Sequence, residues 1–393
     1  MVQGGVTFTG RLGLLAELVT GARGWSSGAG VDEPAMAVLR ADLLADNHRR
    51  HVGSIPAYAR LSAELQVAPD GRHDGAPFLL SDEWFKGYDG AWLDGDLPAL
   101  TAWLGEVSTV HPTHPAGATD LASWRAGLRA DDVFVTISSG TAGSRSLVPR
   151  DRMTLTALRS SSGVRLPWAL APGVYDALLL TPRGMGSGLQ SGASGMAAAA
   201  RRARHDEDPD ALDFVRAAIA DGQPLLAYGS PARLQRWLAC LEAPITLPQR
   251  SCVVTGGGWK RGDDGGGDVF ELLDSAARLL AVPRDRCVDT YSTAELNTVL
   301  VSCPHRRYHV PPVLEAVIVD EQLAAVEGDA DGRLALLEPM ALAYPGRLMT
   351  SDVVRLRHDP CPCGLPGQTL LPGIERMRGA LARGCGVSDR LAS

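Results

Sequence analysis

Lysine is almost absent from this 393-residue chain, because only Lys86 and Lys260 occur among its 38 lysines and arginines. A GC-rich coding bias accounts for the use of arginine at most surface positions. A compact ammonium and a planar guanidinium are not equivalent where one charge meets a phosphate or a carboxylate. The two remaining lysines are therefore candidate functional residues.

Long apolar runs are also missing. No stretch approaches the roughly 18 residues of a membrane-spanning helix, and the apolar start LGLLAELV is interrupted by Glu17 and lacks the charged-then-apolar order of a signal peptide. We therefore expect a cytoplasmic protein without a membrane span. The net charge of −7 argues against nucleic acid or another polyanion as the main partner.

Cysteine is scarce, with seven residues in the whole chain, so a disulfide framework is excluded. In a reducing compartment the cysteines are expected to bind metal, to catalyse or to be buried. Three of them, Cys240 in an expected helix and Cys252 and Cys287 in expected strands, are interpreted as core residues. The composition, with 45% hydrophobic and 21% charged residues, is typical of a soluble globular protein with two or three structural units.

Strands and helices alternate through the middle of the chain. Two amphipathic helices are predicted between residues 33 and 65, interrupted near Gly53 and Pro56, and a loop-rich stretch follows to about residue 125. The expected strands then lie at 133–138, 176–182, 224–229, 251–258 and 286–292, and the clearest helices between them at 231–243 and 268–280. This alternation predicts an α/β fold with a largely parallel, helix-covered sheet.

Beyond residue 300 the pattern changes to strands separated by turns, at 312–320, 332–340 and 352–358, which predicts a smaller β subdomain. We divide the chain into an α/β region with a helical lead-in at 1–300, the β subdomain with its candidate metal ligands at 301–372, and a tail at 373–393.

Glycine and hydroxyl residues follow the first strand in the segment SSGTAGSRS, residues 138–146. Such a segment exposes backbone amides to phosphate, although an ordinary Ser/Gly loop has the same composition. Its candidate nucleotide-binding residues are Ser138, Ser139, Gly140, Thr141, Gly143 and Ser144. After another strand, Gly256, Gly257 and Gly258 allow close approach of a flat ligand such as adenine.

Two further strand ends carry side chains that suit a magnesium nucleotide. Tyr291 offers a stacking ring, and Glu295 offers a hard oxygen ligand for Mg²⁺. The Asp352 carboxylate could accept hydrogen bonds from both ribose hydroxyls. Because loops at the carboxyl ends of strands converge on one crevice in a doubly wound sheet, we expect a single ATP site.

In this order, the motifs SSGTAGS, YSTAE and TSD resemble the nucleotide-binding motifs of the adenylate-forming superfamily, which makes acyl-AMP from a carboxylate and ATP. Within this superfamily, the chain resembles the acyl-protein synthetases of bioluminescence operons. The resemblance lies in the blocks SIPAYARL, EWFKGYDG, VPRDRMTL, GGGWKRG, HVPPVLEAVIVD and RGCG. The resemblance implies the fold of the superfamily's N-terminal domain, with ATP and Mg²⁺ as cofactors. It also implies nucleotide contacts by Tyr291, Ser292, Asp352 and Arg376, and catalytic roles for Glu295 and for Lys86 or Lys260.

The chain departs from the superfamily pattern at three positions. Ser146 stands where many members carry lysine, Ala294 replaces the motif threonine and Ser292 replaces glycine. The first two changes remove contacts near the phosphates, so a catalytically silent nucleotide-binding protein is one alternative.

An acyl- or aryl-CoA ligase of the phenylacetate-CoA ligase type is the other alternative. Those enzymes extend into a mobile C-terminal domain with its own catalytic lysine. Here only about twenty residues follow Pro372, too few to form such a domain. We therefore expect that domain to be absent.

Cys385 lies between two glycines in the terminal segment LARGCGVSDRLAS. The neighbouring Arg383 favours the thiolate, which is a good nucleophile for an acyl adenylate. In the resembling family the Arg-Gly-Cys cysteine carries the acyl group, and an NADPH-dependent acyl reductase receives it. The predicted function is activation of a carboxylic acid, by family default a fatty acid, followed by transfer to Cys385 and then to a partner protein.

Cys303, His309, Cys361 and Cys363 lie in the segments CPHRRYH and CPCG at the two sides of the β subdomain. Two short-spaced ligand pairs joined by the fold are typical of a four-coordinate structural zinc site, and related phenylacetate-CoA ligases have a similar pattern. His305 is a substitute ligand. The alternative is two turns that hold buried cysteines.

Overall fold

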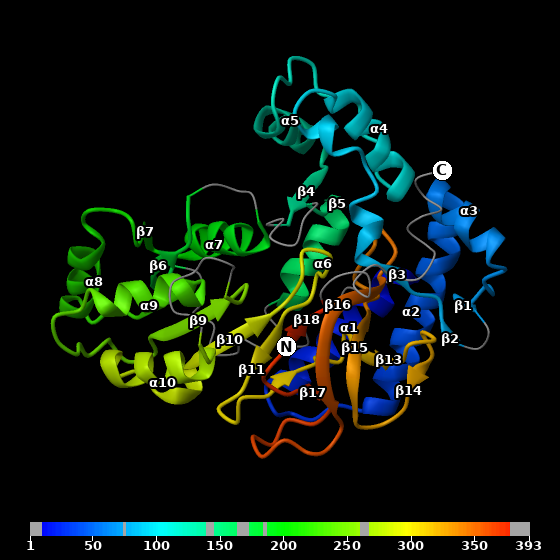
Figure 1. The fold of residues 1–393 in the computed structure, drawn as a ribbon. Helices are drawn as coiled ribbons and strands as arrows, with labels where there is room; N and C mark the ends of the chain where they lie inside the picture. The colour runs from blue at the N-terminus through cyan, green and yellow to red at the C-terminus, as the bar shows by residue number, and fades with distance from the viewer. Residues whose placement is uncertain are drawn as a thin grey trace, which may run out of the picture.

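A single mixed sheet organises the protein. The computed structural model describes residues 10–73, 76–138, 145–162, 173–183, 187–259 and 267–377. Within these ranges the main sheet has 14 strands, and two small sheets of two strands lie apart from it. The strand order is β14-β13-β15-β16-β17-β12-β11-β10-β9-β8-β6-β7, with β3 and β18 also paired to β16. Figure 1 shows the parallel half in green and yellow and the antiparallel half mainly in orange and red.

The parallel half confirms the predicted alternation of strands and helices. Its strands are β6 (Asp176–Leu180), β7 (Arg202–His205), β8 (Leu225–Gly229), β9 (Cys252–Gly256) and β10 (Cys287–Tyr291). Its helices are α7 (Gly188–Ala199), α8 (Ala211–Ala220), α9 (Pro231–Ala239) and α10 (Val269–Leu280). Along β6, Ala177 and Leu179 pack on the α7 side, whereas Leu178 and Leu180 join the core with α8, α9 and α10. Both faces are buried, as parallel strands require.

The antiparallel half continues the same sheet. Its strands are β11 (Leu300–Ser302), β12 (Tyr308–His309), β13 (Glu315–Val319), β14 (Ala325–Val326), β15 (Ala330–Leu337), β16 (Arg347–Arg357), β17 (Thr369–Leu370) and β18 (Glu375–Arg376). Consecutive strands are joined by turns, as the sequence predicts. The core of this half is continuous with the core beneath the parallel strands, because Leu334 and Leu356 belong to the same buried cluster as Leu178.

The N-terminal helices cover the antiparallel strands (Figure 1). They are α1 (Arg11–Ser26), α2 (Glu33–Ser54) and α3 (Pro56–Glu64). The predicted break between two helices falls at Ile55, because Pro56 cannot continue α2 but suits the first position of α3. Leu18 and Leu43 pack against Val313 and Leu342 from the far end of the chain. None of the helices within the described ranges is long and apolar enough to cross a lipid bilayer.

The stretch before residue 125, predicted to be rich in loops, instead contains ordered elements. These are β1 (Arg72–His73), β2 (Ala76–Pro77), β3 (Leu80–Ser81), η1 (Asp82–Phe85), η2 (Gly90–Leu93), α4 (Leu97–Val107), α5 (Leu121–Leu128) and η3 (Arg129–Asp131). Helix α4 is capped by Asp96, whose carboxylate accepts from the Ala99 amide at 3.0 Å. Asp120 caps α5 in the same way, through the Ser123 amide at 2.7 Å. An aspartate at such a position is typical of the start of a helix, and the sequence prediction did not take these two aspartates into account.

The first predicted strand does not belong to the parallel sheet, and that part of the prediction is wrong. Strand β4 (Phe134–Ile137) pairs antiparallel with β5 (Leu147–Arg150) as a separate hairpin, followed by α6 (Arg152–Ser162). Fewer than a dozen residues separate β4 from β5, and a parallel crossover needs a dozen or more. The segment therefore turns back on itself.

Acidification is expected to destabilise the protein through His51 in α2. Its side chain is buried, its Nε2 lies 3.1 Å from the Leu342 carbonyl oxygen, and burial lowers its pKa from 6.5 to about 4. In the unfolded chain the His51 ring becomes protonated at about pH 6.5. In the folded protein the ring stays neutral until about pH 4. The free energy of unfolding should therefore fall by roughly 3 kcal/mol across this interval.

Urea denaturation between pH 7.5 and pH 4.5 measures this effect. His51→Gln keeps an N–H donor for Leu342 without the titrating ring, so its stability should depend less steeply on pH. The same change at the exposed His111 is the control and should leave the profile of the unmodified protein unchanged. Parallel profiles for the protein and His51→Gln would contradict the assignment.

Candidate functional site

Two of the predicted nucleotide-binding residues meet at the carboxyl edge of the parallel strands. The Tyr291 hydroxyl, at the end of β10, donates a 2.7 Å hydrogen bond to the Asp352 Oδ2 in β16. Asp352 lies opposite Arg376 in the register of β16 and β18. The sheet therefore brings together three side chains that the sequence placed in one site.

The Asp352 carboxyl lies in a buried and partly acidic environment. Burial raises its pKa, and the negative charges of Asp82 and Glu295 act in the same direction. The hydrogen bond from Tyr291 and the positive charge of Arg376 oppose this shift. Glu295 itself is 7% exposed. The acids expected to bind ribose and Mg²⁺ thus lie close enough to influence each other's charge.

Asp82 is a site residue that the sequence analysis missed. This buried carboxylate, in η1, lies 3.3 Å from the Ser351 hydroxyl and 3.5 Å from the Arg376 guanidinium. Its Oδ2 also accepts from the Lys86 ammonium at 2.8 Å. The only local signal was its spacing, one helical turn before a lysine already considered functional. Asp82 links Lys86 to the residues around Asp352.

The Lys86 ammonium is held by two carboxylates. Burial alone would lower its pKa, but the charges and hydrogen bonds of Asp82 and Glu83 outweigh it, so the pKa is raised. The distances from Nζ are 2.8 Å to Asp82 and 2.9 Å to Glu83. Lys86 therefore lies beside the candidate site as a charged residue whose charge is already balanced.

The glycine segment after β9 has a conformation that requires glycine. Gly257 and Gly258 have φ values of 78° and 60°, in the left-handed region. At Gly256 a Cβ would lie 2.3 Å from the Thr290 hydroxyl oxygen of the neighbouring strand. The nearest side chain around Gly257 is Leu189 of α7. Thr290 thus occupies the space beside Gly256, whereas a Cβ at Gly258 would meet no atom within 4 Å.

The base of the candidate phosphate loop is closed by backbone and hydroxyl hydrogen bonds. The Ser146 amide donates to the Ser138 Oγ at 2.7 Å, and the Ser138 amide donates to the Ser146 carbonyl oxygen at 3.0 Å. Ser292 is likewise engaged within its own loop, because its hydroxyl contacts the carbonyl oxygens of Thr293 and Thr298 at 3.3 Å. These hydroxyls shape their loops.

Several predicted site residues lie outside the described residues. They are Ser139, Gly140, Thr141, Gly143, Ser144, Lys260 and Cys385.

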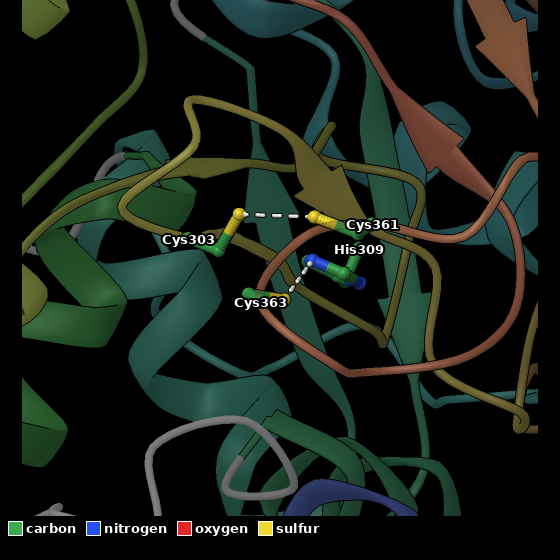
Figure 2. Close-up of side chains that lie close together, drawn as sticks. All are labelled: Cys303, His309, Cys361 and Cys363. Carbon is green, nitrogen blue, oxygen red and sulfur yellow. Dashed lines mark hydrogen bonds between the residues drawn. The ribbon is translucent and has the colours of Figure 1, made fainter.

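The predicted metal ligands converge. Figure 2 shows Cys303, His309, Cys361 and Cys363 pointing toward one another, and their ligand atoms all lie within 4.8 Å. The two cysteine sulfurs of Cys303 and Cys361 are 3.6 Å apart, and the Cys363 sulfur is 3.2 Å from the His309 Nε2. His305, the substitute ligand, is exposed and is not part of this group.

The pairing of β11, β12 and β17 explains this convergence. Cys303 directly follows β11, His309 ends β12, and Cys361 and Cys363 lie in the turn that leads to β17. Burial raises the pKa of the Cys361 thiol to about 12. Three sulfurs and one imidazole are the donors that zinc prefers, and such a cation would favour the thiolate forms. The residues present therefore fit zinc.

The remaining described cysteines give a mixed result. Cys252 and Cys287 are buried in strands, as predicted. Cys240 is exposed, so its assignment to the core is wrong. Helix α9 ends at Ala239, and Cys240 is its C-cap residue, beyond the buried face formed by Leu234 and Trp237.

Comparison with known structures supports the class of fold. An open conformation of 2-hydroxyisobutyryl-CoA ligase, in complex with 2-HIB-AMP and CoA, covers 86% of this chain and 69% of its own, with a TM-score of 0.53 and 15% sequence identity. The same ligase in the postadenylation state gives a TM-score of 0.50. The mixed α/β fold is therefore like that of the adenylate-forming ligases.

Sequence comparison finds similarity to one family in the second half of the chain. Residues 219–391 match the family described as "Acyl-protein synthetase, LuxE". A long-chain-fatty-acid–luciferin-component ligase from Aliivibrio fischeri is 30% identical over 140 residues, and one from Vibrio harveyi is 28% identical over 139 residues. Each alignment covers 35% of this chain and 36% of the relative. The predicted resemblance to the acyl-protein synthetases is confirmed.

Proposed function

We propose that this protein activates a carboxylic acid with ATP, forming acyl-AMP and pyrophosphate, and then transfers the acyl group to its own Cys385, whose thiolate sulfur bonds to the acyl carbon as AMP leaves. The observation that carries the proposal is the meeting of Tyr291, Asp352 and Glu295 at the carboxyl edge of the parallel strands. Ligands of open α/β sheets bind at this edge. The family match and the adenylate-forming fold support the same assignment.

In the proposed site, each group has one task. Asp352 accepts hydrogen bonds from the ribose hydroxyls, and Tyr291 holds its carboxylate in place. The glycine backbone at the end of β9, at Gly257 and Gly258, receives the adenine ring. Glu295 holds Mg²⁺, which neutralises charge on the phosphates.

The chemical step is a displacement at phosphorus. An oxygen of the substrate carboxylate bonds to the α-phosphorus of ATP, the bond from this phosphorus to the bridging oxygen breaks, and pyrophosphate leaves with its electron pair. The developing charge needs positive groups. Lys260 is a candidate for this role, as is Arg376, which contacts Asp82 at 3.5 Å. The charge of Lys86 is already shared between the carboxylates of Asp82 and Glu83. We therefore assign Lys86 the role of fixing Asp82 in place.

A fatty acid is the proposed substrate, since both curated relatives are described as long-chain-fatty-acid ligases. The proposed acceptor is Cys385, and the proposed partner is an acyl reductase that takes the group from it. Coenzyme A as acceptor and a nucleotide-binding protein without activity are the alternatives.

ATP–pyrophosphate exchange, measured with a panel of fatty, aromatic and short-chain acids, tests the function. We expect exchange that depends on both Mg²⁺ and one class of acid. Exchange with no acid, together with tight ATP binding, would favour the silent nucleotide-binding protein and contradict the proposal.

We also propose that the group formed by Cys303, His309, Cys361 and Cys363 holds one structural zinc ion. The ion would tie the turn after β11 to the turn before β17. Helix α1 packs on the same region, because the Trp25 indole donates to the Pro366 carbonyl oxygen at 2.9 Å and its ring lies 6.2 Å from the His309 ring. Zinc would stabilise this junction and take no part in adenylation.

Protein purified without chelator is expected to contain one zinc ion per chain by elemental analysis. Cys361→Ser should lose the ion and lower the melting temperature, because three ligands hold zinc weakly and the remaining thiols stay buried. Cys240→Ser, on an exposed cysteine, is the matched control and should keep both zinc and stability. Metal-free protein with an unchanged melting temperature would exclude the structural ion.

A further inference from the structure

Arg150, at the end of β5, is a buried charge with no described ion-pair partner. Arg150 is 2% exposed, and every hydrogen bond described for its guanidinium goes to a neutral oxygen. A buried guanidinium is costly unless most of its donors are satisfied. The groups that accept these hydrogen bonds are therefore the parts of the structure that Arg150 stabilises.

Those contacts join the β4–β5 hairpin to the loop that carries Glu295. Nη1 donates to the Thr136 hydroxyl in β4 at 2.7 Å. Nη2 donates to the carbonyl oxygens of Ala294 and Leu296, at 2.7 and 2.9 Å. The two carbonyls flank Glu295 on either side, so Arg150 holds the backbone around that residue from a strand that is far away in sequence.

Tyr344 completes the set. Its hydroxyl donates to the carbonyl oxygen of Glu295 itself at 2.8 Å, and the Arg150 guanidinium lies 5.6 Å from the centre of the Tyr344 ring. Three consecutive carbonyl groups, of residues 294 to 296, are thus fixed by two packed side chains. The loop has no freedom to rotate these peptide groups while both side chains stay in place.

A second layer anchors Arg150. Its Nε donates to the Asn297 Oδ1 at 2.7 Å, and the Asn297 amide and side chain donate to the buried Glu338 carboxylate. Burial raises the pKa of Glu338, and the charge of Arg150 opposes this shift. The segment after Glu295 is therefore held from both sides.

We propose that Arg150 is a positioning residue for adenylation, which fixes the Glu295 carboxylate relative to the β4–β5 hairpin and thereby sets the Mg²⁺ requirement of the reaction. The inference rests on the proposed function, in which Glu295 holds Mg²⁺. A planar fork is needed because one side chain must reach Thr136, two carbonyl oxygens and Asn297 together, and lysine cannot match that geometry.

Hydrogen–deuterium exchange and Mg²⁺ titration of Arg150→Lys test the inference. Amide exchange should rise in residues 291–298 and remain unchanged in β9. In ATP–pyrophosphate exchange, the half-maximal Mg²⁺ concentration should rise about tenfold, as expected when a residue that supports a metal ligand is altered. The KM for ATP at saturating Mg²⁺ should stay close to that of the unmodified protein.

Arg347→Lys is the matched control. Arg347 is also buried and also donates to two backbone carbonyl groups, of Gly71 and Asp70, both at 2.8 Å. Its replacement should cost stability without moving the Mg²⁺ requirement. If Arg150→Lys does not fold, Tyr344→Phe removes the hydrogen bond to the Glu295 carbonyl oxygen, together with the one that the Tyr344 hydroxyl accepts from the Asn297 side chain at 2.9 Å. It should shift both readouts in the same direction.

The outcomes separate this inference from the proposed function. Unchanged amide exchange at 291–298 would overturn the positioning role whether or not the protein has activity. Raised exchange with an unchanged Mg²⁺ requirement would overturn the link to the metal. Absence of pyrophosphate exchange in the unmodified protein would instead refute the proposed function, and amide exchange would still decide whether Arg150 positions the loop.

Discussion

Glu295→Gln is expected to lower the rate of acyl-AMP formation by about 100-fold or more at saturating ATP, the scale seen when one electrostatic contact to a transition state is lost. The amide keeps the size of the side chain but loses the charge that binds Mg²⁺. The three backbone carbonyl groups around residue 295 stay fixed by Arg150 and Tyr344. The defect should therefore appear in kcat, with the KM for ATP little changed.

Asp352→Asn provides the contrasting half of this prediction. Ribose contacts exist before and after the chemical step, so their loss should raise the KM for ATP more than it lowers kcat. Asparagine keeps an oxygen that can accept from Tyr291, so the fold should survive. The exposed Glu327, in the turn after β14, is the control, and Glu327→Gln should behave like the unmodified protein. Normal adenylation by both site variants would refute the placement of the nucleotide.

Cys385→Ser is expected to abolish formation of the acyl thioester while leaving ATP–pyrophosphate exchange largely intact. Thiolate is far more nucleophilic than a serine hydroxyl, and Arg383 beside it favours the thiolate form. The protein is incubated with ATP, Mg²⁺ and its acid, and the acyl group is mapped by mass spectrometry. In the unmodified protein it should sit on Cys385 and be removed by hydroxylamine.

The exposed Cys240 supplies a control for non-specific acylation. Cys240→Ser should leave the acyl label on Cys385 at its full level. If Cys385→Ser forms acyl-CoA efficiently from added coenzyme A, and the unmodified protein never carries a label, the protein is a CoA ligase. The proposal that it carries its own acyl group would then be wrong.

The parts of the site that were predictable from sequence have a local signature. Strand ends could be located from aliphatic runs, and parallel strands bring their ends to one edge, which accounts for the position of Tyr291 at the end of β10. Asp352, which was expected at a strand end, instead contacts Tyr291 from the interior of the antiparallel strand β16. The two short-spaced pairs, Cys303 with His309 and Cys361 with Cys363, likewise indicated a metal site. In both cases a short stretch of chain carried the information.

Arg150 had no such signature, and Asp82 had only its spacing from Lys86. The contacts of Arg150 with Ala294 and Leu296 span 144 and 146 residues, and those of Asp82 with Ser351 span 269 residues. A buried charge is recognisable only when its partners are known. Two of the acceptors of Arg150 are backbone oxygens, which every residue possesses, and the Ser351 hydroxyl that contacts Asp82 comes from a distant strand. The β4–β5 hairpin was missed for a simpler reason, since a strand's composition does not reveal which neighbour it pairs with.

The partners of the N-terminal helices set the order in which the protein can fold. His51 contacts Leu342 across 291 residues, and β3 pairs with β16. At about 5–20 residues per second, the ribosome takes tens of seconds to deliver the C-terminal partners. Until then the apolar faces of α1 and α2 stay uncovered, so the nascent chain is a natural client for chaperones. A ribosome stalled before β16 would leave an N-terminal fragment whose apolar helix faces stay exposed, so this fragment should aggregate.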